Sequence, residues 1–177
     1  MTDQHETTAR LWTEQGFCDD AWQRVEELPA VAGDACYLLS MGVFLSVGDN
    51  RRAELAGRLG VEIAPGEPLD DIVPHLDALG LVALAFPAFS DGRSFSKAEL
   101  LRTRHGYQGP LRAVGDVLID QIPHMLRTGF SEFAISNPTT LKRLEKGETG
   151  GIPLHYQPTT RGGVKATGYA WRWRSQI

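Results

Sequence analysis

The sequence has few cysteines and no long apolar run. Its two cysteines, Cys18 and Cys36, do not form a close pair, and no cluster of Cys and His offers a ready set of metal ligands. No apolar stretch approaches the roughly 18 to 20 residues that span a bilayer, and the first residues lack the basic-then-apolar order of a secretory signal. We therefore expect no metal site and no membrane segment, and we predict a cytoplasmic protein.

Motifs for nucleotide binding and for common hydrolytic chemistry are also missing. No G-x-G-x-x-G follows the first predicted strand, and there is no Walker loop, no H-E-x-x-H and no G-x-S-x-G elbow. The glycine-rich stretch 147–151 follows a predicted helix instead of a strand, which is the wrong geometry for holding a phosphate on a helix N-terminus. The sequence therefore assigns no cofactor.

Acidic residues outnumber basic ones outside the C-terminal segment. The formal net charge of the chain is −4, and residues 159–177 carry four basic residues and no acid, which leaves −8 for the remainder. This acidic body argues against a general nucleic-acid binder. Within the basic segment, residues 169–174 alternate aromatic and basic side chains, as a two-faced strand does. Stacking on a nucleobase or binding an anionic partner is the alternative interpretation.

The apolar pattern predicts an α/β protein made of repeated strand–helix units with a parallel sheet. A chain of 177 residues fits one compact domain, and from Asp34 onward short apolar runs alternate with amphipathic stretches. We divide the chain into an N-terminal arm or edge hairpin (1–33), a single α/β domain (34–158) and a basic aromatic tail or strand (159–177). The predicted strands are 36–40, 61–64, 81–86, 111–115 and 132–136.

Two helix starts carry clear sequence signals. Ser96 and Glu99 form the pattern of a capping box, which predicts a helix that begins at Ser96 and ends before Gly106. Asn137, followed by proline, predicts the N-cap of the last helix.

Polar residues follow three of the predicted strands at the point where each ends. Asp91 and Arg93 follow the third strand, Asp116 and Gln121 follow the fourth, and Asn137 follows the fifth. The carboxyl ends of parallel strands lie at one edge of the sheet, where such folds bind their ligands. These side chains are therefore candidates for a common site.

A further signal lies inside the fourth strand, where Arg112 shares a face with Val114 and Asp116. An arginine in a central strand is costly unless it is paired, so we predict an interior that holds its carboxylate partner, either Asp91 or Asp116. This one-sided charge favours a partial TIM-like barrel over an open doubly wound sheet. Five units are fewer than the eight of a closed barrel, so a homodimer or an N-terminal hairpin would cover the open edge.

These residues allow two interpretations. In the functional one, Arg93 and Arg112, with Gln121 and Asn137 beside them, bind a small anionic ligand while a catalytic Asp91 or Asp116 handles a proton. In the structural one, which we favour, the ion pairs fix the order of the strands and the other polar groups cap turns and helices.

Several segments together resemble a known bacterial family. They are residues 86–93, 96–102, 106–109, 111–116, 120–121 and 127–130. The family they resemble has no known function, and its members are described as oxidoreductases associated with sulfite reduction. That description rests on genes found beside the sulfite reductase haemoprotein in sulfate assimilation. The resemblance implies an accessory protein of assimilatory sulfite reduction with an undefined reaction, and it supplies no established catalytic residues.

Three functions remain open at this point. The first is a redox enzyme that acts near sulfite reductase, which is what the family description implies. The second is a non-catalytic adaptor that docks on the reductase or on an electron carrier. The third is a protein that binds a small molecule in a half-barrel cleft.

Overall fold

The computed structural model describes residues 9–31 and 33–150, so the basic aromatic segment 159–177 lies outside the described residues. Within them, eight strands form one sheet in the order β2-β1-β8-β7-β6-β5-β4-β3. The strands are β1 (Arg10–Thr13), β2 (Gly16–Cys18), β3 (Trp22–Arg24), β4 (Cys36–Ser40), β5 (Leu59–Ile63), β6 (Leu81–Phe86), β7 (Leu111–Gly115) and β8 (Glu132–Ile135).

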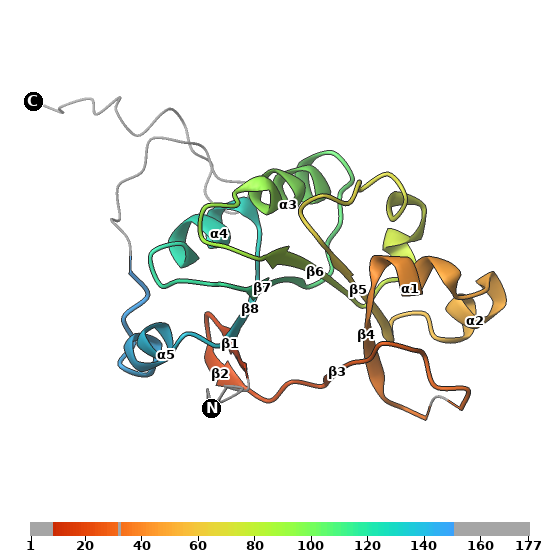
Figure 1. Ribbon diagram of the computed structural model, residues 1–177, viewed down its shortest axis with the longest axis horizontal. Coiled ribbons are helices and arrows are strands. Elements are labelled where there is room, and N and C mark those ends of the chain that lie inside the picture. The colour runs from red at the N-terminus through yellow and green to blue at the C-terminus, as the bar shows by residue number, and fades with distance from the viewer. Residues whose placement is uncertain (1–8, 32, 151–177) are drawn as a thin grey trace, which may run out of the picture.

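The sheet is mainly parallel and strongly curled. Strands β3 to β8 run parallel to one another, whereas β1 pairs antiparallel with β8, and β2 pairs antiparallel with β1. Figure 1 shows the strands following a curve, with the stretch between β2 and β3 running across the open side. The molecule is therefore an α/β half-barrel, which confirms the predicted class and agrees with the preference for a partial barrel.

Helices cover the outside of the curve (Figure 1). The largest side chains of the sheet alternate onto this outer face, where they form the main core with the helices. A second, small cluster of Leu38, Leu81 and Ala83 lies on the inner face with Trp22 and Val114 packed against it. The helices are α1 (Met41–Ser46), α2 (Asp49–Glu54), the 3-10 helix η1 (Val73–Ala78), α3 (Arg93–Thr103), α4 (Ile122–Thr128) and α5 (Pro138–Glu145).

Three of the five predicted strands, 36–40, 81–86 and 111–115, have the predicted bounds. The strand predicted at 61–64 begins two residues earlier and contains Gly60. Gly60 is needed there because a Cβ atom at this position would lie 3.0 Å from the ring of Trp22. The missing side chain lets the indole lie against the inner face.

The predicted start of α3 is wrong, whereas that of α5 is confirmed. Helix α3 begins at Arg93 with Gly92 as its N-cap, so Ser96 lies inside the first turns. The buried Ser94 hydroxyl donates to the carbonyl of Ala85 at 2.6 Å and ties the earlier start to β6. At α5, the Asn137 Oδ1 accepts a hydrogen bond from the Thr140 N–H at 3.0 Å, as an N-cap does.

Candidate functional site

The two outer edges of the half-barrel are joined by only three residues. Strand β2 ends at Cys18 on one edge and β3 begins at Trp22 on the other. Four residue steps reach at most about 14 Å, which is roughly three strand spacings of about 4.8 Å. This segment, residues 19–21, is called the bridge below, and it carries Asp20 across the inner face.

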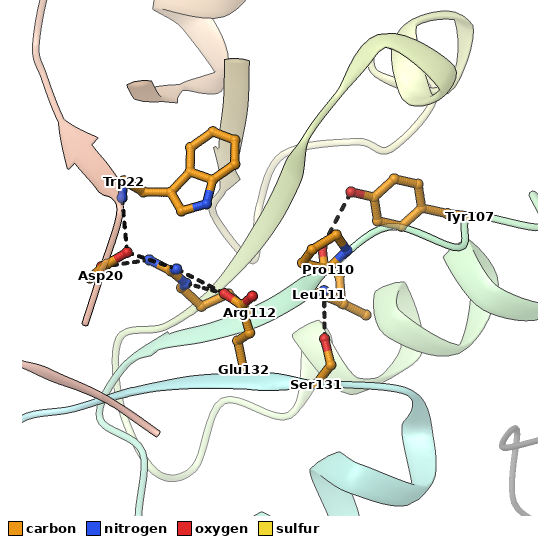
Figure 2. A network of polar contacts seen from close by, with 8 residues as sticks. All are labelled: Asp20, Trp22, Tyr107, Pro110, Leu111, Arg112, Ser131 and Glu132. Carbon is orange, nitrogen blue, oxygen red and sulfur yellow. Dashed lines mark hydrogen bonds and ion pairs between the residues drawn. The ribbon is translucent and has the colours of Figure 1, made fainter. Parts of the chain in front are cut away.

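Arg112 reaches from the middle of β7 to this bridge (Figure 2). Its two terminal nitrogens donate to the two carboxylate oxygens of Asp20 at 2.8 and 3.0 Å, and its Nε donates to Oε2 of Glu132 at 2.9 Å. The Arg112 side chain is 3% exposed, against 37% for Asp20 and 19% for Glu132. A buried guanidinium is thus paired with two carboxylates that remain in contact with solvent.

The prediction that Arg112 pairs with Asp91 or Asp116 is therefore wrong. Glu132 is the direct neighbour of Arg112 in the register of β7 and β8, and Asp20 arrives through the bridge. The Asp116 backbone N–H donates to the carbonyl of Phe86 at 2.7 Å, directly after Gly115. The expectation that Arg112 faces an interior with a carboxylate was right, but the carboxylates come from other elements.

Carboxylates outnumber arginines on the inner face. Glu62 stands in the same row of the sheet as Arg112, with Ala83 between them. It forms an ion pair with Arg24 of β3 at 2.9 Å, while burial raises the pKa of Glu62 despite that arginine. An anionic ligand would have to compete with Asp20 and Glu132 for Arg112 and would meet further negative charge nearby.

A separate ion pair joins Asp91, on the loop between β6 and α3, to Arg93, the first residue of α3. The Arg93 Nε donates to Asp91 Oδ1 at 2.9 Å, and a terminal nitrogen donates to Oδ2 at 2.7 Å. The hydrogen bond from Arg93 lowers the pKa of Asp91, and the same contact raises the pKa of Arg93. A carboxyl group that is held ionised in this way is poorly suited to act as a general acid at neutral pH.

Gln121 and Asn137 serve the backbone around them. Buried Gln121 accepts a hydrogen bond from the Leu118 N–H at 3.1 Å and donates to the Phe89 carbonyl at 3.4 Å. The structure thus brings Gln121 to the loop that carries Asp91 and leads into Arg93 of α3. Within the described residues, no hydrogen bond or ion pair joins the side chains of Asp116 or Asn137 to the other predicted site residues.

Two residues of this region were missed by the sequence interpretation. Phe89 is 59% exposed on the loop between β6 and α3. The sequence offered one indication of this exposure, because polar residues follow this phenylalanine directly. Lys97 of α3 is buried, and its ammonium group donates to the carbonyls of Ala64, at 2.6 Å, and Glu67. Burial lowers the pKa of Lys97. Lys97 therefore stabilises the turn at residues 64–67 through these two hydrogen bonds.

The motifs at 106–109 and 127–130 have a structural explanation. Arg102 of α3 donates hydrogen bonds to the carbonyls of Tyr107 at 2.6 Å, Gly109 at 2.8 Å and Gly129 at 2.8 and 3.0 Å. Gly129 has φ +105°, and a Cβ there would lie 2.5 Å from Cγ of Arg102. The Tyr107 hydroxyl donates to Pro110 at 3.2 Å (Figure 2), and burial raises its pKa to about 12. This cluster holds α3, α4 and the entry to β7 together.

A pocket of about 370 Å³ lies beside the bridge, lined by residues 9–11 and 17–20. In residues 9–31 and 33–150, no group of three or more His, Cys, Asp or Glu is arranged to hold a metal ion. A membrane-spanning helix is likewise not found there, because no described helix combines sufficient length with sufficient apolar character.

These observations define the class of protein as a mainly parallel α/β half-barrel closed by a charged contact between its bridge and β7. A family model described as a bacterial protein of unknown function, DUF934, matches residues 60–166. That match covers more than half of the chain, so the protein belongs to this family. The comparison with curated proteins gives no match.

Proposed function

We propose that this protein is a cytoplasmic accessory protein of assimilatory sulfite reduction that acts by docking on a partner protein. The partner is the sulfite reductase haemoprotein or the carrier that delivers its electrons. The connection to sulfite reduction comes from the family resemblance of the sequence segments. The preference for docking over catalysis comes from the geometry of the loop between β6 and α3, residues 87–92.

The observation that carries the proposal is Phe89. Its ring is 59% exposed, although the loop is anchored by the Gln121 contact to its carbonyl and by the Asp91–Arg93 ion pair. Aromatic residues and arginine are enriched in the hot spots of protein interfaces, so an exposed ring on a fixed backbone beside an arginine suits such a role. The loop lies at the carboxyl end of β6, the edge at which TIM-like folds place their functional groups.

A reaction that uses the chain's own carboxylates has less support. Asp91 is bound by Arg93 and its pKa is lowered, so it does not supply a proton readily. Arg112 is shielded from an incoming anion by Asp20 and Glu132. Both arrangements favour a structural role for Asp91 and Arg112, which the sequence interpretation had put forward as a proton-transfer group and an anion ligand.

The test compares binding of the full chain and two variants to the purified haemoprotein and to its electron carrier. Phe89→Ser removes the exposed ring of the loop, and Leu100→Ser is the matched control, because Leu100 is 41% exposed on α3. Loss of an interface centre is expected to weaken binding by roughly 30-fold or more, equivalent to at least about 2 kcal/mol. The control should change binding less than about threefold, and both variants should keep the wild-type unfolding temperature.

Two results would contradict the proposal. The first is absence of binding by the wild-type chain to either partner. The second is an effect of Phe89→Ser no larger than that of Leu100→Ser. Turnover of sulfite or of an electron donor by the purified chain alone would instead establish the enzymatic alternative.

A further inference from the structure

The half-barrel leaves both outer strands with a free edge. Among the described residues β2 pairs only with β1, and β3 pairs only with β4. A free edge exposes unpaired backbone N–H and C=O groups, and proteins usually cover or charge such edges. The edge of β2 adjoins the pocket of about 370 Å³ described above, which includes Cys18 and the start of the bridge.

This pocket is acidic with an apolar side. Asp19 and Asp20 line it, and Asp19 has no ion pair within the described residues. The basic residue of the lining, Arg10, is already engaged, because it pairs with Glu145 at 2.5 Å and lies 4.1 Å over the ring of Phe17. The pocket therefore suits an occupant that carries both positive charge and aromatic surface.

Gly150, the last described residue, lies at the same end of the sheet as this pocket. A Cβ at Gly150 would lie 3.0 Å from the carbonyl of Ile119, in the segment that follows β7. Cys18 stands opposite Leu11, which pairs with Ala134 in the second half of β8. Both points thus lie toward the carboxyl ends of β7 and β8. The nineteen residues from 150 to 169 span at most about 60 Å when extended, so reach does not limit contact.

We propose that residues 169–174 of the same chain dock at this pocket along the free edge of β2. Tyr169, Trp171 and Trp173 would supply the aromatic surface, and Arg172 and Arg174 the charge that complements Asp19. Their alternation is that of an added strand. A covalently linked segment also has a higher effective concentration at the site than the same segment of a second copy. This proposal is independent of the partner-docking function.

The test uses the full chain and its native thiol at the pocket. Cys36→Ser leaves Cys18 as the native cysteine, and a second cysteine is introduced by Ala170→Cys or, as the control, by Thr159→Cys. Under mild oxidation at low protein concentration, the Ala170→Cys chain should form an intrachain disulfide with Cys18 at least about tenfold faster than the control, because docking raises the effective concentration. Asp19→Asn should reduce that advantage, which is measured by mass spectrometry of peptides.

Equal rates for the two introduced cysteines would overturn the proposal, since they would reflect random collisions. A disulfide between chains whose rate rises with protein concentration would overturn it in favour of a second copy. As an independent readout, backbone amides of residues 169–174 in the unmodified chain should exchange hydrogen more slowly than those of an unstructured peptide. If these amides exchange as fast as those of the unstructured peptide, the proposal is contradicted, and this result does not depend on any substitution.

Discussion

Arg112 is held by two carboxylates that the sequence places far apart. Asp20 lies 92 positions before it and Glu132 lies 20 positions after it. Burying a guanidinium is favourable only while its partners remain in place, because an uncompensated charge is strongly penalised inside a protein. At the scale of single residues, this contact ties the bridge to the centre of the sheet and aligns β7 with β8.

Arg112→Met should lower the free energy of unfolding by about 2 to 3 kcal/mol, because Asp20 and Glu132 would lose their shared cation. Adding Glu132→Leu should restore part of that loss, since it removes one of the two unpaired carboxylates. The control is Arg93→Met, because the Arg93 side chain is 64% exposed and its ion pair with Asp91 should contribute far less to stability than the buried contact of Arg112. Urea unfolding measures all three variants, and an equal effect at Arg93 and Arg112 would contradict this account.

Helix ends show how one sequence pattern can be correct and a similar one misleading. Asn137 caps α5 because the following proline fixes the first helical residue and the amide side chain bonds to Thr140. Ser96 has the same kind of pattern but lies within α3, which starts at Arg93. The contact of Ser94 with β6 is a tertiary interaction, and it extends the helix beyond its local signal.

This difference predicts opposite results for two alanine substitutions at the element scale. Asn137→Ala should cost about 1 kcal/mol of stability, because the Thr140 N–H loses its acceptor. Ser96→Ala should be neutral or stabilising by up to about 0.5 kcal/mol, because alanine is the better residue inside a helix. Chemical denaturation compares the two, and a loss at Ser96 as large as that at Asn137 would mean that the capping box does form.

The sequence predicted the central strands well because their apolar runs are short, buried and rich in Val, Leu and Ala, as in 81–86 and 111–115. It did not predict the partner Asp20, because the bridge has no periodic pattern and its position depends on which strands form the edges. Glu132 could have been found. It opens the strand after that of Arg112, and parallel neighbours place such residues side by side. The exposed ring of Phe89 depends on how the whole loop is anchored, which local patterns do not encode.

At the scale of the whole molecule, the main core lies between the outer face of the sheet and the helices, and Tyr107 belongs to it. Its hydroxyl is neutral in the folded state up to a pKa of about 12, whereas the ordinary value is 10.0. The folded protein therefore keeps a proton that the unfolded chain has released between these values. The contribution of Tyr107 to stability is therefore fully present below pH 10 and is lost as the pH rises toward 12.

Tyr107→Phe removes this alkaline sensitivity. At pH 8 the variant should be less stable than the wild type by about 1 kcal/mol, because the hydrogen bond to Pro110 is lost. Between pH 9 and pH 11 the difference should shrink by roughly 1 kcal/mol, since only the wild type carries the titrating hydroxyl. Urea unfolding across this range checks the prediction, and a constant difference would show that Tyr107 ionises equally in both states.

The position of β1 has a consequence for the order in which the molecule forms. Strands β3 to β8 follow one another in the chain as they do in the sheet, so each can pair with its predecessor as it leaves the ribosome. The β1–β2 hairpin is synthesised before all of them but pairs with β8, the last, and such distant pairing slows folding. Its apolar residues Leu11 and Trp12 therefore stay uncovered through most of translation. A circular permutant that opens the chain within residues 19–21 and places the hairpin after β8 would add every strand in spatial order.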